Sequence, residues 1–210
     1  HSVNEILEGD TIEIKINIYE GKKQLVEKIN ILGNTVTDES VIRSELLLDE
    51  GDPFNKLKLD QSIARLKARN IFGEIKNEIT DGSNNSQKII EISVEEKPTG
   101  EISAGAGIGT TGGSFAFNIR ENNWLGKGIN IGTNIDVSAE RFSGGVSITD
   151  PNYNFSGNSL TVFGSRTTNN KKNSGYKNNI ISTGIGTKFE QYRNFYISPT
   201  LLYQYDDLTV

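Results

Sequence analysis

Apolar residues along this chain follow two different periods, and the change falls near residues 97–100. C-terminal to that point they alternate with Gly, Ser, Thr and Asn almost without interruption, as in residues 102–109 and 129–137. A period of two places successive side chains on opposite faces of a strand. The pattern therefore predicts about seven antiparallel strands long enough to cross a bilayer, each with one apolar face.

The polar side of these predicted strands indicates a membrane barrel. A soluble sandwich would carry Lys and Glu on its outer face, whereas here that side is small or uncharged, as in a barrel lumen. At one end of the strands the turns carry aromatic residues, which gather at bilayer interfaces. We expect that interface role for Trp124, Tyr153, Phe155 and Tyr192, although aromatic residues can also flank turns by chance. The polar segment 166–179, at the opposite end, predicts a long unstructured extracellular loop.

Before residue 97, charged residues are dense, and both helical and strand periods occur. Leu59, Ile63 and Leu66 recur at the spacing of an amphipathic helix, and the alternation in residues 11–19 is typical of a half-buried strand. Two helices on one face of a small sheet would close a compact α+β core. The predicted elements are strands at 11–19 and 24–32, helices near 39–46 and 59–70, and strands at 74–80 and 88–95.

Composition argues against most enzyme and nucleic-acid classes. The 210 residues have a net charge of −5, no cysteine and one histidine, His1. No basic excess favours nucleic acid, and thiol or histidine chemistry is not expected. The string Gly107-Ile108-Gly109-Thr110-Thr111-Gly112 matches a dinucleotide fingerprint, but a strand follows it where a helix is required, so it predicts a hairpin. We expect no catalytic residues, metal site or cofactor.

Several strings resemble known families. Residues 26–34, 70–75 and 94–97 resemble a POTRA domain. The strings at 107–109, 121–128 and 149–153 resemble the start of the barrel in outer-membrane assembly proteins that carry POTRA domains. The resemblance covers essentially the whole chain. It implies the end of a preceding POTRA domain at 1–20, a β-α-α-β-β POTRA domain at 21–97, and the N-terminal part of a transmembrane β-barrel at 98–210.

This resemblance implies a non-enzymatic protein that inserts other β-barrel proteins into the bacterial outer membrane, with its POTRA domain in the periplasm. The expected partners are unfolded outer-membrane protein clients, assembly-complex lipoproteins, at Glu50 and Gly51, and outer-membrane lipids. Nucleic acid is not expected. Two alternatives stay open: a polypeptide translocation pore of the same superfamily, or another POTRA-bearing assembly factor. A passive porin would not need the POTRA domain.

Two strands are expected to capture client strands. The first barrel strand is rich in Gly and Ala, so it offers backbone groups with little side-chain packing; the same glycines could instead serve barrel curvature. This lateral-gate strand comprises Glu101, Ile102, Ser103, Ala104, Gly105, Ala106, Gly107, Ile108 and Gly109. The other is the POTRA edge strand implied by the resemblance, with Glu74, Ile75, Lys76, Asn77, Glu78, Ile79 and Thr80.

Overall fold

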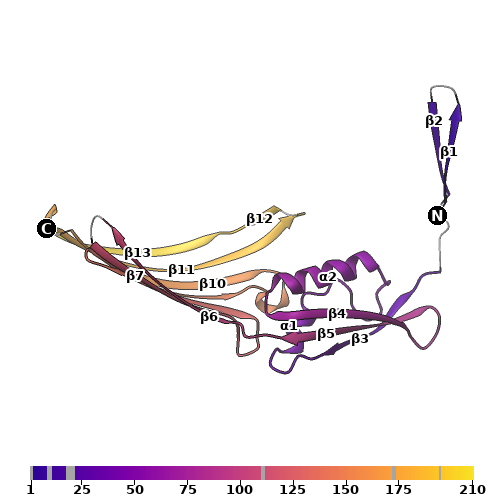
Figure 1. Cartoon of the computed structure of the whole chain (residues 1–210), viewed down its shortest axis with the longest axis horizontal. Coiled ribbons are helices and arrows are strands. Elements are labelled where there is room, and N and C mark those ends of the chain that lie inside the picture. The colour runs from indigo at the N-terminus through magenta and orange to yellow at the C-terminus, as the bar shows by residue number, and fades with distance from the viewer. Residues whose placement is uncertain (1, 9–10, 18–21, 110–111, 172–173, 194) are drawn as a thin grey trace.

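The structure is a computed structural model of the chain, and the residues that it describes form three separate sheets (Figure 1). It describes residues 2–8, 11–17, 22–109, 112–171, 174–193 and 195–210. The first sheet is a hairpin of β1 (Ser2–Glu8) and β2 (Thr11–Asn17). The second belongs to a small module of strands and helices, and the third is large and curved. Among the described residues, none of the helices is long and apolar enough to span a membrane.

The small module, here called the α+β module, has the predicted order of strand, helix, helix, strand, strand. Its sheet order is β3-β5-β4, with β3 parallel and β4 antiparallel to the central β5. The Asn55 side chain accepts hydrogen bonds from the amides of Leu57 and Lys58, which fixes the start of the longer helix. The elements are β3 (Leu25–Leu32), α1 (Glu39–Arg43), α2 (Lys56–Ala68), β4 (Phe72–Asp81) and β5 (Gln87–Glu96).

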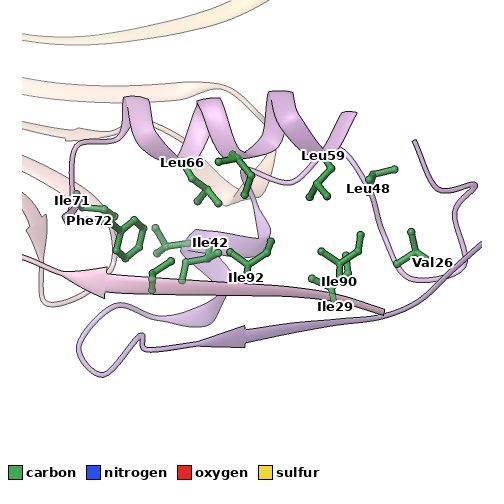
Figure 2. Packing of buried hydrophobic residues seen from close by; sticks show 13 residues of the cluster. Val26, Ile29, Ile42, Leu48, Leu59, Leu66, Ile71, Phe72, Ile90 and Ile92 are labelled. Atoms are coloured by element: carbon green, nitrogen blue, oxygen red, sulfur yellow. The ribbon is translucent and has the colours of Figure 1, made fainter. Parts of the chain in front are cut away.

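One hydrophobic core holds this module together. Leu59 and Leu66 of α2 point toward the sheet, and Ile92 of β5 points back toward them (Figure 2). Ile42 of α1 fills the space between these layers and is fully buried. The spacing of the apolar residues in α2 places them on one face, so the amphipathic pattern becomes the helix–sheet interface. The 13 buried residues of the core all lie between Val26 and Val94, so the module has its own interior.

The large sheet is antiparallel and follows the chain from β6 to β11, with β12 and β13 both paired to β11. Neighbouring strands are consecutive in sequence because each is joined to the next by a short connection. The strands are β6 (Gly100–Gly109), β7 (Gly112–Trp124), β8 (Ile129–Ser138), β9 (Arg141–Asp150), β10 (Ser159–Lys171), β11 (Tyr176–Tyr192), β12 (Phe195–Ile197) and β13 (Thr200–Thr209). The sheet is not closed by the described strands.

The strand register places the predicted apolar residues on a single face of the large sheet. Directly paired residues share a face, and such pairs include Ile102 with Ile119, Phe117 with Ile135, Ile148 with Val162, and Ile185 with Leu201. The opposite face is polar and hollowed: a cavity of about 380 Å³ is lined by Glu101, Asn118, Arg120, Asn134 and Ser147, among others. The alternation read from the sequence is therefore confirmed as one apolar face and one polar face.

The expected unstructured loop at residues 166–179 is wrong. β10 and β11 pair residue by residue as far as Lys171 with Tyr176. Cross-strand bonds support this extension, because Thr168 Oγ1 donates to Asn179 Oδ1 at 2.6 Å. A high content of Asn, Lys and Thr indicates contact with water rather than lack of pairing, since a hairpin beyond the apolar band can be polar on both faces.

Some predicted features fall partly outside the described residues. These are the last two residues of the strand predicted at 11–19, the hairpin residues Thr110 and Thr111, and residue 194 of a turn. On either side of the hairpin, Gly109 pairs with Gly112, so strand pairing continues up to it.

Candidate functional site

The free edge of β3 is covered from within the module. Glu50 Oε1 accepts a hydrogen bond from the Ile29 amide at 3.0 Å, and Arg43 Nη2 donates to the Ile29 carbonyl at 3.0 Å. The following loop runs along the same edge, where the Gly51 amide donates to the Val26 carbonyl at 2.7 Å. These contacts occupy backbone groups that a further strand would need. The Glu50 carboxylate is therefore an internal edge cap, and it lies 3.8 Å from Arg43 Nη1.

β4, by contrast, pairs only with β5 among the described strands, so one of its edges faces outward. This strand contains the predicted edge residues Glu74 to Thr80. Ile75 and Ile79 pack partly against the core, while the other five side chains are exposed. Lys76 Nζ and Glu74 Oε2 form an exposed ion pair at 3.0 Å. The two edges of the small sheet thus differ: β3 is capped and β4 is open.

The predicted lateral-gate strand lies at the margin of the large sheet. β6 pairs with β7 and with no other described strand. All of its residues are exposed. A Cβ atom added at Gly105 or Gly109 would meet nothing within 4 Å, and one at Gly107 would lie 3.2 Å from Ser114 Oγ. The polar face of β6 therefore has little side-chain packing to hold it.

The predicted interface aromatics gather at one end of the large sheet. β6 begins beside the α+β module, so the antiparallel strands β7, β9 and β11 end on that side. Trp124 ends β7, Tyr153 and Phe155 bound the 3₁₀ turn after β9, and Tyr192 ends β11. Each is about half exposed or more.

A buried hydrogen-bond network joins the α+β module to the first turn on this side, between β7 and β8. The Asn123 side chain donates to Thr37 Oγ1 at 2.8 Å and accepts from the Gly128 amide at 2.7 Å. The Asp38 amide donates to the Gly126 carbonyl at 2.8 Å. We call this contact the joint. It is tight, because a Cβ atom at Gly126 would lie 2.0 Å from a backbone carbonyl oxygen of the module.

Arg69 supports the joint from the end of α2. Its Nη2 donates to the Gly128 carbonyl at 2.7 Å, and its Nη1 lies 3.6 Å from Glu45 Oε1. Burial lowers the pKa of Arg69, and the charges of Glu45 and Asp150 oppose that shift. The Glu45 carboxylate is itself buried and also pairs with Arg65 at 3.3 Å. A buried charge is tolerated when it is paired and hydrogen-bonded, as these charges are.

Glu96, at the end of β5, fixes the loop that reaches the joint. Its carboxylate accepts hydrogen bonds from the amides of Thr35, Val36 and Thr37 and from the Thr35 hydroxyl, at 2.6–3.1 Å. Burial raises the pKa of Glu96, but the hydrogen bonds from Thr35, Thr37 and Val36 outweigh burial and lower it to about 2. A carboxylate with several donors is stabilised in its charged form.

The sequence did not predict a functional role for Asn123, Thr37, Arg69, Glu45 or Glu96. Asn123 lies within the string Asn122-Asn123-Trp124-Leu125-Gly126, which resembles the barrel family, so that string was the available signal. Glu96 lies within the string at 94–97 that resembles a POTRA domain. The other three lie in ordinary polar or helical contexts, and only the fold brings them together.

Comparisons with known proteins agree with this architecture. Residues 24–97 match the POTRA family, described as surface antigen variable number repeat. Over 118 residues the chain is 36% identical to the outer membrane protein assembly factor BamA of Neorickettsia risticii. The matched region covers 55% of this chain and 16% of that protein.

Two solved structures share the fold. BamA from Haemophilus ducreyi lacking POTRA domains 1–3 has a TM-score of 0.76 and 24% identity, covering 100% of this chain and 41% of that one. CdiB from Acinetobacter baumannii has a TM-score of 0.63 and 12% identity, and the match covers 94% of this chain and 39% of that one.

The α+β module is therefore a POTRA domain, and the large sheet is part of an outer-membrane β-barrel. The POTRA domain lies in the periplasm and the large sheet in the outer membrane. The chain is a POTRA-and-barrel segment similar to the outer membrane protein assembly factor BamA. It spans less than a fifth of the length of the curated relative it matches.

Proposed function

We propose that the full-length protein folds and inserts other β-barrel proteins into the outer membrane by pairing client strands with its own free strand edges, without enzymatic chemistry. The observation that carries the proposal is the difference between the two edges of the POTRA sheet. β3 is capped by Glu50 and Arg43, whereas β4 has an open edge. The name of the Neorickettsia relative, an assembly factor, supports the same role.

Strand addition at β4 would use backbone hydrogen bonds, which are independent of the client sequence. Such pairing suits clients whose sequences have little in common except the alternation of apolar and polar residues along their strands. The charged pair of Glu74 and Lys76 lies on the exposed side of the strand, where charges discourage aggregation without blocking the backbone. The edge is therefore open to an extended chain yet resists pairing with another folded sheet.

Site-specific photo-cross-linking tests this edge with a matched pair of lysines. Lys76 on β4 and Lys28 on β3 are both exposed on edge strands, but only β3 is capped. A photoreactive residue at position 76 of the full-length protein should capture unfolded barrel clients, and one at position 28 should not. Equal capture at both positions, or capture at position 28 alone, contradicts the proposal.

The second capture site in this proposal is β6, acting as the lateral gate. Its open polar face at Gly105 and its position at the sheet margin support this role. Gly105→Val fits the available space and raises strand propensity by up to about 1 kcal/mol, which would favour a closed seam.

Client insertion into liposomes measures this effect. The Gly105→Val protein should fold its own barrel normally and insert clients slowly. Gly164→Val, on the interior strand β10 where an added Cβ has only one contact at 4.0 Å, is the matched control and should insert at the normal rate. If Gly105→Val inserts clients at the control rate, the glycines serve curvature instead. A translocation pore would release the client on the far side of the bilayer.

For Glu50 and Gly51 we propose docking of an assembly-complex lipoprotein. The loop is accessible, since Gly51 is exposed and a Cβ atom added there would meet nothing within 4 Å. Because Glu50 also caps Ile29, Glu50→Lys would disturb the fold as well as the charge. Glu50→Gln keeps an acceptor for Ile29 and removes only the charge, so loss of co-purification in Glu50→Gln would support ionic docking. Retention would contradict it.

Two further assignments belong to this proposal. Trp124, Tyr153, Phe155 and Tyr192 would lie at the periplasmic interface of the bilayer, since they share the end of the sheet beside the POTRA domain. Residues 1–20 would be the end of a preceding POTRA domain, with 21–97 as the next and 98–210 as barrel. Fluorescence quenching of Trp124 by lipids brominated at different depths tests the interface assignment; quenching from the bilayer centre would contradict it.

A further inference from the structure

A charged side chain interrupts the apolar face of the large sheet at Arg166. In the strand register Arg166 lies directly opposite Gly144 on β9 and Ile181 on β11. It therefore shares the face that carries Val162 and Ile185 and that meets lipid in a barrel. Within the described ranges its guanidinium has no hydrogen-bond or ion-pair partner. The other β10 residues on this face are Leu160, Val162, Gly164, Thr168 and Asn170.

The outline of the apolar face shows how deep Arg166 lies. On β7, β8 and β9, the apolar residues extend to Phe115, Val137 and Phe142. The same row of paired residues continues on β10, β11 and β13 as polar Thr168, Asn179 and Asp207. The apolar band thus ends one row earlier on those strands, a step of about 7 Å along the strand.

Strand tilt explains this step. Barrel strands lie roughly 35–45° from the membrane normal, so a row of hydrogen-bonded partners crosses the bilayer obliquely. On β11 and β13 the last apolar residues are Ile181 and Tyr205, in the same row as Arg166. Arg166 therefore lies at the rim of the apolar band, next to the polar Thr168 and on the side away from the POTRA domain. At this level a long basic side chain reaches the headgroups, whereas the same charge at the bilayer centre would be strongly unfavourable.

We propose that Arg166 binds the phosphate group of an anionic lipid in the leaflet farther from the POTRA domain. A planar guanidinium matches phosphate geometry with two parallel hydrogen bonds. The surface beside it is open: Gly144 and Gly164 flank Arg166 on the same face, and a Cβ atom at either position would meet no atom closer than 3.7 Å. On this outer part of the face, neither neighbouring strand, β9 or β11, carries an acidic residue, and Asp207 lies on β13 beyond β11. The site goes beyond the proposed insertion activity and lies on the opposite face from the lumen.

Lipid retention tests the site with a matched control. The full-length protein is placed in nanodiscs of phosphatidylcholine with phosphatidylglycerol, and the lipids that stay bound are counted by native mass spectrometry. Arg166→Gln should reduce phosphatidylglycerol retention by about tenfold, the loss of a charge-assisted hydrogen bond. The control is Arg141→Gln, because Arg141 pairs with Asn169 and so lies at the same end of the sheet on the polar face. It should retain lipid like the unmodified protein.

Unchanged retention in Arg166→Gln overturns the proposal, and so does an equal loss in Arg141→Gln, which would reflect net charge alone. The depth of position 166 in the bilayer tests the rim position independently of lipid retention. Nitroxide labels on Arg166→Cys and Val162→Cys should differ in depth by about 10 Å, with position 166 among the headgroups. A label at 166 that lies as deep as the one at 162 would contradict the rim position and therefore the phosphate contact.

Discussion

Replacing Asn123 with alanine should loosen the joint between the POTRA domain and the barrel. The side chain satisfies two buried partners, Thr37 Oγ1 and the Gly128 amide. In Asn123→Ala the Gly128 amide loses its acceptor in a buried position, which costs about 1–3 kcal/mol, and the lost bond to Thr37 adds about 1 kcal/mol. The sum, about 2–4 kcal/mol, corresponds to about a 30- to 1,000-fold increase in the population of the open joint.

Amide hydrogen exchange in the full-length protein measures this opening. The Gly128 and Asp38 amides are donors within the joint, so both should exchange faster by that factor. Amides of β5 should be unaffected. Asn122→Ala is the matched control, because the Asn122 side chain makes only a long bond of 3.4 Å to the Thr99 carbonyl. If both variants change exchange by less than about threefold, Asn123 does not hold the joint.

Three further predictions concern other parts of the structure. Gly126→Ala should open the joint through a steric clash, whereas Gly157→Ala, with a similar positive φ of 76° and open surroundings, should show only mild strain; hydrogen exchange compares them. Folding lowers the pKa of Glu96 from 4.5 to about 2, so its contribution to stability is full above pH 4.5 and is lost as the pH falls toward 2. The unfolding free energies of the unmodified POTRA domain and of Glu96→Gln should therefore converge as the pH approaches 2. Leu59→Ala should destabilise that domain by about 2–5 kcal/mol, but Leu57→Ala, 72% exposed, by less than about 0.5 kcal/mol in denaturant unfolding.

Local periodicity was sufficient to predict the strands and their faces. Residues 102–109 alternate so regularly that face assignment needs no knowledge of neighbours, because the side-chain period of a strand is fixed by its backbone. The order of elements in the POTRA domain followed from the same reasoning together with turn signals. The loop prediction at 166–179 was wrong because a water-exposed hairpin and a disordered loop have similar composition, and only cross-strand partners such as Asn169 and Asn178 separate them.

The joint and the capped edge could not be read from the sequence. Thr37 and Asn123 are 86 positions apart, and their contact depends on how the first barrel turn meets the POTRA domain. The resemblance implied that Glu50 docks a partner, because it placed Glu50 in the loop between the two helices. The hydrogen bond from the Ile29 amide to Glu50 could be found only in the folded sheet. Long-range pairing of ordinary polar residues leaves no local pattern to detect.

The joint also bears on how a lateral gate could work. POTRA contacts reach the barrel at the end of β7 and the turn after it, through Asn123, Gly126 and Gly128. β6 is held differently. At its start, the Thr99 hydroxyl donates to Glu121 and the Thr99 carbonyl accepts from the Asn122 amide. The rest of β6 is held only by its pairing with β7. A movement at the outer edge of β6 would therefore break none of the joint contacts. On the proposed mechanism, the POTRA domain can stay fixed to β7 while the gate strand opens, so variants of the joint and of Gly105 should affect client insertion through separate steps.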